Sequence, residues 1–322
     1  MQKIYDIAII GAGPAGIATA VESVIFGIEE ILVFEKGANH SETIRKYFDD
    51  KKPVDKEWKG IQVDLKGHVN FDGGTKDDTL NIFEESLSKH RIEAKFQTEV
   101  VGIQREDGHF LVTTNANEKF LSSCIVIAIG KMGKPNKPEY ELPKTLKAKI
   151  NHNIADCKGG EDVLVVGGGD SAVEYAYFIC EDNRVTFSYR KEQITRANPK
   201  NKNNLLNAAA AGKIEMRLGV DIESVTDKEG RCMVAFADGH TSLYDRIIYA
   251  LGGTTPKEFL ANTPVLVDEA LKPLVDEKNF NSDGVYVAGD IAGSLGGSIA
   301  LALNHGYHIV QDILKKGCKS RA

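Results

Sequence analysis

The residues with the clearest chemical potential are three glycines near the start of the chain, Gly11, Gly13 and Gly16. They form the spacing G-x-G-x-x-G between the apolar residues 7–10 and a second apolar-rich stretch, which predicts a strand, a tight turn and a helix. Pro14 suits the first turn of that helix, because the N–H group that it lacks has no partner there. In such a turn the helix N-terminus presents backbone N–H groups to phosphates, so the pattern favours a dinucleotide site.

The element after this turn supports the same interpretation. Residues 31–34 predict a second buried strand, and Glu35 ends it. An acidic residue at this place accepts hydrogen bonds from the hydroxyl groups of an adenosine ribose. The alternative is an ordinary glycine turn between two strands, without a ligand.

A second copy of the pattern begins at residue 162. Gly167, Gly169 and Ala172 give G-x-G-x-x-A after an apolar run and before a predicted helix. The next predicted strand, residues 184–189, ends in basic rather than acidic residues. Arg190, Lys191 and Arg196 favour a 2′-phosphate, and therefore NADPH over NADH, because charged donors form strong hydrogen bonds to phosphate. The alternative is that these cations are solvated surface charges.

The copies extend beyond the glycine turns. Each is followed by two predicted hairpin strands, at 98–104 and 109–114 and again at 221–226 and 231–236. Each then has a buried strand that ends in A-x-G, at Gly130 and at Gly252. Two nucleotide folds in one chain suggest hydride transfer between two bound nucleotides.

A third nucleotide-binding element is expected near the end of the chain. Residues 285–290 predict a strand that ends in Gly289 and Asp290, and residues 298–314 predict a helix. An Asp at such a strand end can bind a ribityl hydroxyl group, and the helix N-terminus at Ser298 and Ile299 can stabilise a reduced flavin ring. His305 and His308 have helical spacing, but no third metal ligand lies close in sequence, so no metal is expected.

Two segments between these elements leave alternatives open. Residues 36–74 are polar and show little periodicity before a predicted amphipathic helix at 77–90, so they read as a loop over a cofactor. Trp58 in this loop either shields a cofactor or anchors a surface. Residues 131–144 contain four lysines and three prolines and read as a domain crossing, whose charge is either a docking patch or a solvated loop.

Composition limits the function classes. The 322 residues suffice for two domains, and the formal net charge of -6 argues against a nucleic-acid binder. No apolar run could span a bilayer, and no signal peptide is evident, so we expect a cytoplasmic protein. The five cysteines form no C-x-x-C pair, and we expect reduced structural thiols.

In order and spacing, the segments IAIIGAGPAG, VLVVGGGDSA and VYVAGD resemble the low-molecular-weight thioredoxin reductase family over essentially the whole chain. The resemblance implies an α/β fold with two Rossmann-like, three-layer ββα domains. It implies a discontinuous FAD domain, residues 1–130 and 251–322, with an NADPH domain inserted at 131–250, and a homodimer. For FAD it implies the contact residues Gly11, Gly13, Pro14, Ala15, Gly16, Glu35, Lys36, Val100, Gly130, Gly289, Asp290, Ser298 and Ile299. For NADPH it implies the contact residues Gly167, Gly169, Asp170, Ser171, Ala172, Arg190, Lys191, Arg196 and Gly252.

The chain departs from that family at one decisive place. The redox-active C-x-x-C would fall at residues 150–153, where the sequence reads Ile-Asn-His-Asn, and Cys157 is the nearest cysteine. Members without the cysteine pair resemble the ferredoxin- or flavodoxin-NADP reductases of thioredoxin reductase type. The segments CIVIAIGKMGKPNKP, SYRKEQITR and IALALNHGY look like the flavodoxin:quinone reductases. A bacillithiol-disulfide reductase would commonly carry a cysteine in the first glycine turn, where this chain has Ala15.

These features predict an FAD-dependent NADPH oxidoreductase without a catalytic side chain, in which the flavin itself donates electrons to flavodoxin, ferredoxin or a quinone. Two alternatives stay open. One is a disulfide reductase that uses a substrate thiol or Cys157. The other is a flavin-containing redox sensor that does not turn over. The sequence gives neither the physiological acceptor nor the direction of electron flow.

Overall fold

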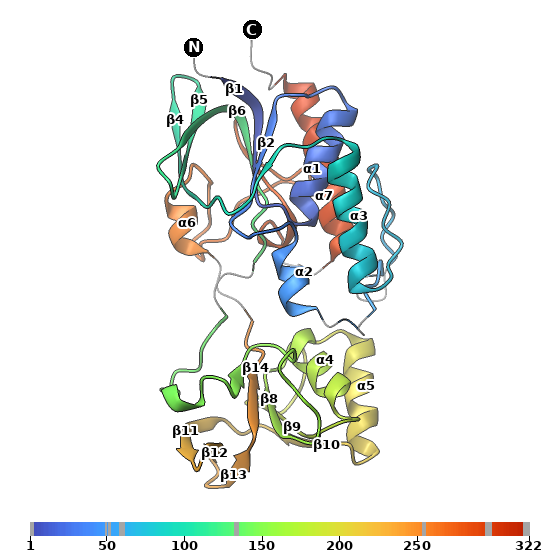
Figure 1. The fold of residues 1–322 in the computed structure, drawn as a ribbon, viewed down its shortest axis with the longest axis vertical. Helices are drawn as coiled ribbons and strands as arrows, with labels where there is room; N and C mark the ends of the chain where they lie inside the picture. Colours follow the sequence, from blue (N-terminus) through green and yellow to red (C-terminus); the bar gives the residue numbers. More distant parts are fainter. Residues whose placement is uncertain are drawn as a thin grey trace. The chain divides into compact units, whose positions relative to one another are not determined.

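In a computed structural model, the chain folds into two compact units (Figure 1). The structure describes residues 3–48, 50, 53–57, 62–131, 135–252, 256–293 and 298–317. The first unit comprises Met1–Gly133 and Thr254–Ala322, and the second comprises Lys134–Gly253. The domain boundaries expected from the sequence, after residues 130 and 250, lie three residues before the observed ones.

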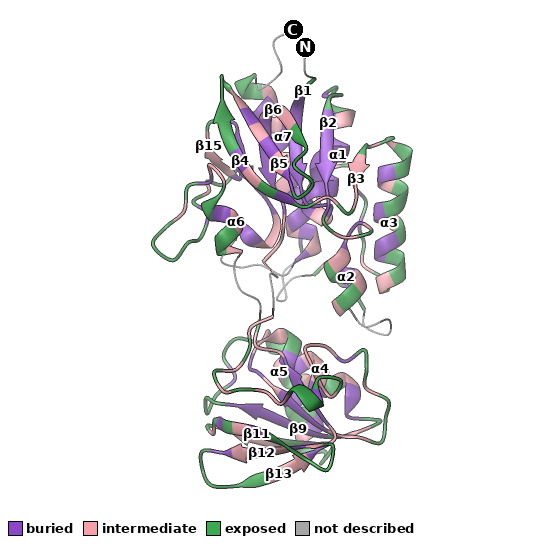
Figure 2. Cartoon of the chain, turned by 60° about the vertical axis from the view of Figure 1, so that its left-hand side comes forward, coloured by how far each residue is buried: buried purple, intermediate pink, exposed green. Residues whose placement is uncertain are grey.

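The first unit is built on an eight-stranded sheet in which β1 (Ile4–Ile10) pairs in parallel with β2 (Ile31–Phe34) and β6 (Lys119–Ile127). The inner strands are buried on both faces, as their runs of Val, Ile and Leu require. Figure 2 shows them in the colour of buried residues. The other strands are β3 (Ala94–Lys95), β4 (Val100–Glu106), β5 (His109–Thr114), β15 (Phe280–Ser282) and β16 (Val285–Val287).

Alternate residues of β1 face two different layers. Ile7 and Ile9 pack in a cluster with residues of α1 (Pro14–Ile25) and α7 (Ile299–Lys316). Ala8 and Ile10 instead pack in a cluster with residues of the β4–β5 hairpin. The first unit therefore has helices on one face of its sheet and antiparallel strands on the other. Its remaining helices are α2 (Glu42–Tyr47), α3 (Lys76–Lys89) and α6 (Lys257–Ala261), with a 3₁₀ turn at Gly289–Ile291.

The second unit repeats this plan with a five-stranded parallel sheet, ordered β10-β9-β8-β14-β7. Val163 and Val165 of β8 face the helices, and Leu164 faces a separate three-stranded antiparallel sheet. The parallel strands are β7 (Ile150–Asn151), β8 (Asp162–Val166), β9 (Arg184–Tyr189), β10 (Ile214–Leu218) and β14 (Arg246–Tyr249). The antiparallel strands are β11 (Ile222–Lys228), β12 (Arg231–Phe236) and β13 (Thr241–Tyr244). The helices are α4 (Asp170–Ile179), α5 (Pro199–Ala210) and a 3₁₀ turn at Lys144–Leu146.

The predicted fold class is confirmed: two three-layer ββα units, one of them discontinuous in sequence and the other inserted into it. Which dinucleotide each unit binds is a separate question that the fold alone does not answer.

We expected no regular elements in the polar stretch 36–74, and that expectation was wrong. It contains a short helix, α2, and it is anchored to the helical layer by two buried side chains. Glu22 of α1 accepts hydrogen bonds from the backbone N–H and ring Nδ1 of His68. Asn304 of α7 bonds the backbone of Asp64 and Lys66. Trp58 lies outside the described residues.

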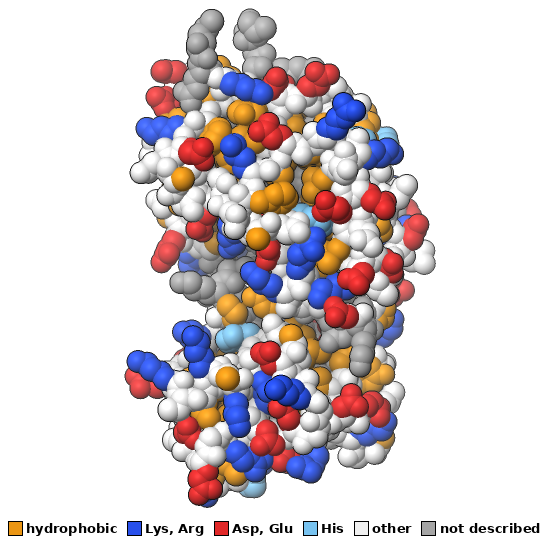
Figure 3. All heavy atoms as spheres, viewed as in Figure 1, with side chains coloured by type: hydrophobic (Ala, Val, Ile, Leu, Met, Phe, Trp, Pro, Cys, Tyr) orange, Lys and Arg blue, Asp and Glu red, His pale blue; other side chains and the backbone are white. Residues whose placement is uncertain are grey.

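The surface carries both signs of charge. On the face drawn in Figure 3, Lys and Arg side chains are interspersed with Asp and Glu side chains, so no extended area of one sign is visible there. None of the described helices is both long and apolar enough to cross a bilayer.

Candidate functional site

The first glycine turn has the geometry of a phosphate cradle. Gly11 has φ +108°, and a Cβ atom there would lie 2.5 Å from the Ala128 carbonyl oxygen. A Cβ atom on Gly16 would lie 1.9 Å from the Gly11 carbonyl oxygen, so the helix can pack here only without a side chain. Gly13 differs, because nothing lies within 4 Å of its would-be Cβ. The open space at Gly13, at the N-terminus of α1, is where a pyrophosphate can approach.

Glu35 is built into this cradle. Its Oε2 accepts a hydrogen bond of 2.9 Å from the Ala12 backbone N–H, and its Oε1 accepts one of 2.7 Å from Gly37. The end of β2 is fastened to the turn as well, because the Gly11 N–H donates to the Phe34 carbonyl oxygen at 2.7 Å. A carboxylate has about four acceptor positions, so two remain for ribose hydroxyl groups. The structure thus brings Glu35 to the glycine turn, as the sequence predicted.

The third nucleotide-binding element meets the same turn. A Cβ atom on Gly289 would lie 3.3 Å from the Cβ atom of Ala15, so the end of β16 borders the start of α1. Gly289 has φ +73°, and its N–H donates to the ring Nδ1 of His305 at 3.0 Å. Asp290 lies in the 3₁₀ turn that follows, and Ser298 caps α7 by accepting a hydrogen bond from the Leu301 N–H.

His305 has a role that sequence reasoning missed. Burial, together with the neighbouring His308, lowers the pKa of His305 to about 4. Its neutral ring accepts the Gly289 N–H and holds the strand end against α7. The i, i+3 spacing of His305 and His308 in the sequence gave no sign of this contact with the Gly289 backbone. Among the described residues, no group of His, Cys, Asp and Glu side chains could hold a metal ion.

The second glycine turn reproduces the first in detail. Gly167 has φ +148°, and a Cβ atom there would lie 2.4 Å from the Ala250 carbonyl oxygen. Gly169, at the N-terminus of α4, has open space around it as Gly13 does. Ala172 is fully buried at the third motif position. The second turn therefore also leaves room for phosphates.

The charges around the second turn differ from those around the first. Arg190, Lys191 and Arg196 follow β9 and are exposed to solvent. Within the described part of the chain, none of them has a hydrogen bond or ion pair to another residue. Tyr189 fixes the end of β9 at the turn, since a Cβ atom on Gly168 would lie 2.2 Å from the tyrosine ring. Three unpaired cations thus lie within the seven residues that follow this strand end.

The other predicted contact residues lie at or near these turns. Lys36 is exposed directly after Glu35, and the Val100 side chain is buried at the start of β4. Gly130 and Gly252 have φ +65° and +79° after the equivalent strands β6 and β14. Ser171 is exposed in the first turn of α4. Asp170 is in place too, but its carboxylate bonds other residues of the chain.

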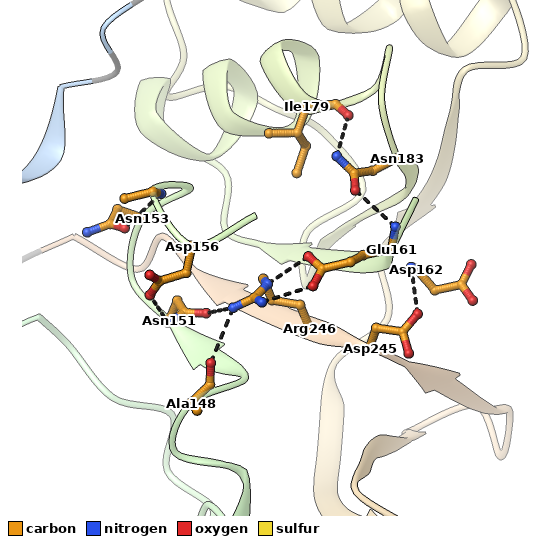
Figure 4. A network of polar contacts seen from close by, with 11 residues as sticks. Ala148, Asn151, Asn153, Asp156, Glu161, Asp162, Ile179, Asn183, Asp245 and Arg246 are labelled. Atoms are coloured by element: carbon orange, nitrogen blue, oxygen red, sulfur yellow. Dashed lines mark hydrogen bonds and ion pairs between the residues drawn. The ribbon is translucent and has the colours of Figure 1, made fainter. Parts of the chain in front are cut away.

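The place of the missing cysteine pair is a polar anchor (Figure 4). The buried Arg246 of β14 forms a two-point ion pair with Glu161, with two N–O distances of 2.9 Å. The same guanidinium donates to the Asn151 side chain and to the Ala148 carbonyl oxygen. Asn151 also donates to Asp156. These contacts hold β7 against β14.

The other two positions of the missing motif are likewise engaged. The ring Nδ1 of His152 lies 3.2 Å from the Tyr249 carbonyl oxygen, which can only accept, so the ring donates. The Asn153 side chain accepts from the Ala155 N–H at 3.1 Å. Residues 150–153 therefore stabilise the second unit and offer no group that could carry electrons.

The nearest thiol is a poor nucleophile. Burial raises the pKa of Cys157 to about 11, so at neutral pH the group is almost wholly protonated. Cys180 and Cys232, also free, are buried in the second unit, and burial raises the pKa of each. None of these three thiols is activated for disulfide exchange. Cys124 of β6 is disulfide-bonded, so the expectation of reduced thiols was wrong for this residue.

Comparison with known proteins gives consistent similarities. Residues 8–289 match the family model described as pyridine nucleotide-disulphide oxidoreductase. A ferredoxin–NADP reductase of Ignicoccus hospitalis is 25% identical over 296 residues, which cover 89% of this chain and 90% of that protein. A bacilliredoxin reductase of Bacillus subtilis is 28% identical over 332 residues, covering 96% and 97%. The crystal structure of T. acidophilum thioredoxin reductase shares the fold, with a TM-score of 0.80, 17% identity and coverage of 98% and 99%.

Proposed function

The chain belongs to the pyridine nucleotide-disulphide oxidoreductases, and we propose that it transfers electrons from NADPH through FAD directly to a flavodoxin, a ferredoxin or a quinone. No dithiol relay takes part. The protein is an oxidoreductase that uses FAD and NADPH, as the ferredoxin–NADP reductases and thioredoxin reductases to which it is similar do. When bound, the flavin accepts a hydride from NADPH and gives up its electrons one or two at a time.

We assign FAD to the first unit and NADPH to the second. In the first, Gly13 leaves space for the pyrophosphate and Glu35 supplies free acceptor positions for the ribose. In the second, Gly169 leaves the equivalent space, and Arg190, Lys191 and Arg196 supply positive charge for a 2′-phosphate. The residues of the chain orient the two dinucleotides, and no side chain has to act as a nucleophile or base for hydride transfer.

The single observation that supports a mechanism without a dithiol relay is the set of polar contacts at residues 150–153. The four positions where a dithiol would lie hold Ile, Asn, His and Asn, and three of these side chains bond the surrounding structure. Because Cys157 is protonated at neutral pH, it does not replace the pair. The names of the ferredoxin–NADP reductase relatives support a protein acceptor with a redox centre of its own.

A second candidate is a disulfide reductase, and one observation favours it: the bacilliredoxin reductase of Bacillus subtilis matches nearly the full length of this chain. In such an enzyme the flavin would have to reduce the substrate disulfide without a cysteine pair at residues 150–153. Flavodoxin and quinone as acceptors, the homodimer and the cytoplasmic location remain predictions.

The test is an anaerobic acceptor screen with the purified, flavin-loaded protein, in which the absorbance of NADPH follows its oxidation. We expect turnover with flavodoxin, ferredoxin or a quinone, and background rates with thioredoxin or a low-molecular-weight disulfide. Cys157→Ala should keep the first activities, with Cys180→Ala as the control at another free thiol of the second unit.

Three outcomes would contradict the proposal. Rapid reduction of a disulfide substrate would favour the second candidate. Loss of flavodoxin and quinone reduction in a folded Cys157→Ala protein would place a thiol in the electron path. A single reduction of the flavin by NADPH, without turnover on any acceptor, would instead indicate a redox sensor.

A further inference from the structure

The segment 190–198, which carries the three unpaired cations, is held at two points. Ile194, 3% exposed, is inserted into the hydrophobic cluster between the parallel sheet and the helices of the second unit. At the end of the segment, the Asn198 N–H donates to Oδ1 of Asp170 at 2.7 Å. Arg190 and Lys191 therefore precede the first anchor, and Arg196 lies between the two.

The second anchor is a small network between α4 and α5, which lie side by side in Figure 1. Asn201 donates through its side-chain Nδ2 to Oδ1 of Asp170 at 3.2 Å and to Oε1 of Glu174 at 2.8 Å. Asn198 caps α5 by accepting the Asn201 backbone N–H at 2.8 Å. Asp170 and Glu174 are four residues apart on α4, so both can face the N-terminus of α5, whose positive end stabilises them.

The position of Asp170 raises an electrostatic question. It is the first residue of α4, directly after the glycine turn where phosphates are expected. A carboxylate aimed at that space would repel a phosphate. Its Oδ1 instead accepts two hydrogen bonds from the beginning of α5, and this arrangement ties the end of the cationic segment to the helix that begins at the phosphate site.

We propose that Asp170 is a positioning residue for NADPH selectivity: it holds segment 190–198 so that its cations meet the 2′-phosphate, and its side chain does not contact the dinucleotide. The inference rests on the proposed binding of NADPH by the second unit. Without the Asp170 anchor, the segment would have to order its cations on binding, and that entropic cost would fall on NADPH alone.

The experiment measures the Kd values of NADP⁺ and NAD⁺ by titration calorimetry on the flavin-loaded protein, so that turnover is not needed. Asp170→Ala should weaken NADP⁺ binding by about tenfold and NAD⁺ binding by less than about twofold, the scale of a lost charge-assisted hydrogen bond. Asp170→Asn should bind both nearly as the wild type does, because Oδ1 remains as an acceptor. Asn201→Ala should also weaken NADP⁺ binding more than NAD⁺ binding, but by a smaller factor than Asp170→Ala does. The exposed Asn203→Ala on the same helix is the control.

A second arm separates positioning from direct contact. In a background in which Arg190, Lys191 and Arg196 are all replaced by Ala, adding Asp170→Ala should not further change the ratio of the NAD⁺ Kd to the NADP⁺ Kd, because the three cations that Asp170 positions are gone. A further fall in that ratio would show that Asp170 itself contacts the dinucleotide, and the inference would be wrong. An unchanged ratio in folded Asp170→Ala protein would overturn it too.

The failure of the proposed function would look different. If the protein with Arg190, Lys191 and Arg196 all replaced by Ala kept the wild-type ratio of Kd values, these cations would not select NADPH at all. The cofactor assignment of the second unit would then fall, and the positioning role with it. If Asp170→Ala and Asp170→Asn each changed the Kd values of NADP⁺ and NAD⁺ by the same factor, only the charge of the carboxylate would matter. That result would also contradict a positioning role.

Discussion

At the scale of single residues, the two glycine turns have nearly the same backbone and opposite chemistry at the following strand end. After β2 a carboxylate, Glu35, is bonded into the turn, and after β9 three unpaired cations follow. A carboxylate accepts hydrogen bonds from a free ribose hydroxyl and repels a phosphate, and a guanidinium does the reverse. The same fold can therefore bind two different dinucleotides in one chain.

A matched pair of substitutions tests this assignment. Gly13 and Gly169 have φ near −85° and −100°, which valine adopts without strain, and each would place its side chain in open space. We expect Gly13→Val to fold but to lose FAD, because the branched side chain fills the space of the pyrophosphate. Gly169→Val should keep FAD and lose NADP⁺ binding. Flavin absorbance and calorimetry measure the two effects.

The two substitutions act as controls for each other. Loss of FAD from Gly169→Val, with retention in Gly13→Val, would show that the dinucleotides are assigned to the wrong units.

At the scale of elements, the short edge strand β7 shows how a segment that could carry redox cysteines can serve stability instead. β7 has only two residues and pairs with β14 at two positions. Two paired residues hold a strand only weakly, and the side chains of Arg246, Glu161 and Asn151 supply further contacts. Removing one partner of such a buried pair leaves an uncompensated charge, which costs about 3 kcal/mol or more.

This network predicts how stability depends on pH. The hydrogen bonds from Arg246 hold the pKa of Glu161 below its ordinary value. The folded state thus binds the proton less tightly than the unfolded chain does, so the contribution is present above the unfolded-state pKa and disappears as the pH falls through the folded-state pKa. We expect Glu161→Gln to lower Tm at neutral pH and to differ less from the wild type below about pH 4.

Thermal unfolding between neutral and acidic pH measures this difference. Glu181→Gln, which removes an exposed partner of Lys213, is the control and should have little effect. A Tm difference for Glu161→Gln that does not change with pH would contradict the assigned cause.

At the scale of the whole molecule, two similar units differ in the elements that border their glycine turns. Each has a glycine turn, a helical layer and an antiparallel layer, but among the described residues the first unit alone has the third element at Gly289 and Asp290. The first turn is therefore bordered by the ends of β6 and β16 as well as by the end of β2. We infer that the flavin ring is held in the first unit and that the second unit binds a diffusible dinucleotide.

The expected consequence is a fixed stoichiometry. The purified protein should be yellow and contain one FAD per chain, and added NADP⁺ should bind at one further site. Flavin released by denaturation, compared with protein concentration, measures the first number, and calorimetry measures the second. A colourless protein that takes up no FAD, or one that holds two per chain, would contradict the division of tasks.

The parts of this protein that are encoded within short stretches could be predicted from the sequence. Residues 31–34, 109–114 and 231–236 were predicted as strands with the bounds observed, because alternating or continuous apolar runs and flanking turn residues are local signals. The glycine turns were evident for the same reason: spacing of two and three residues defines them.

Features that depend on partners far apart in the sequence became visible only in the three-dimensional structure. The edge strands β3, β7 and β15 have two or three residues and exist only because neighbouring strands pair with them. His305 meets Gly289, Arg246 meets Asn151, and Asp170 meets Asn198 across 16, 95 and 28 residues. Such contacts are set by how layers pack, and no local pattern records them. For this reason the sequence showed which residues could bind nucleotides, and the fold showed which residues hold them in place.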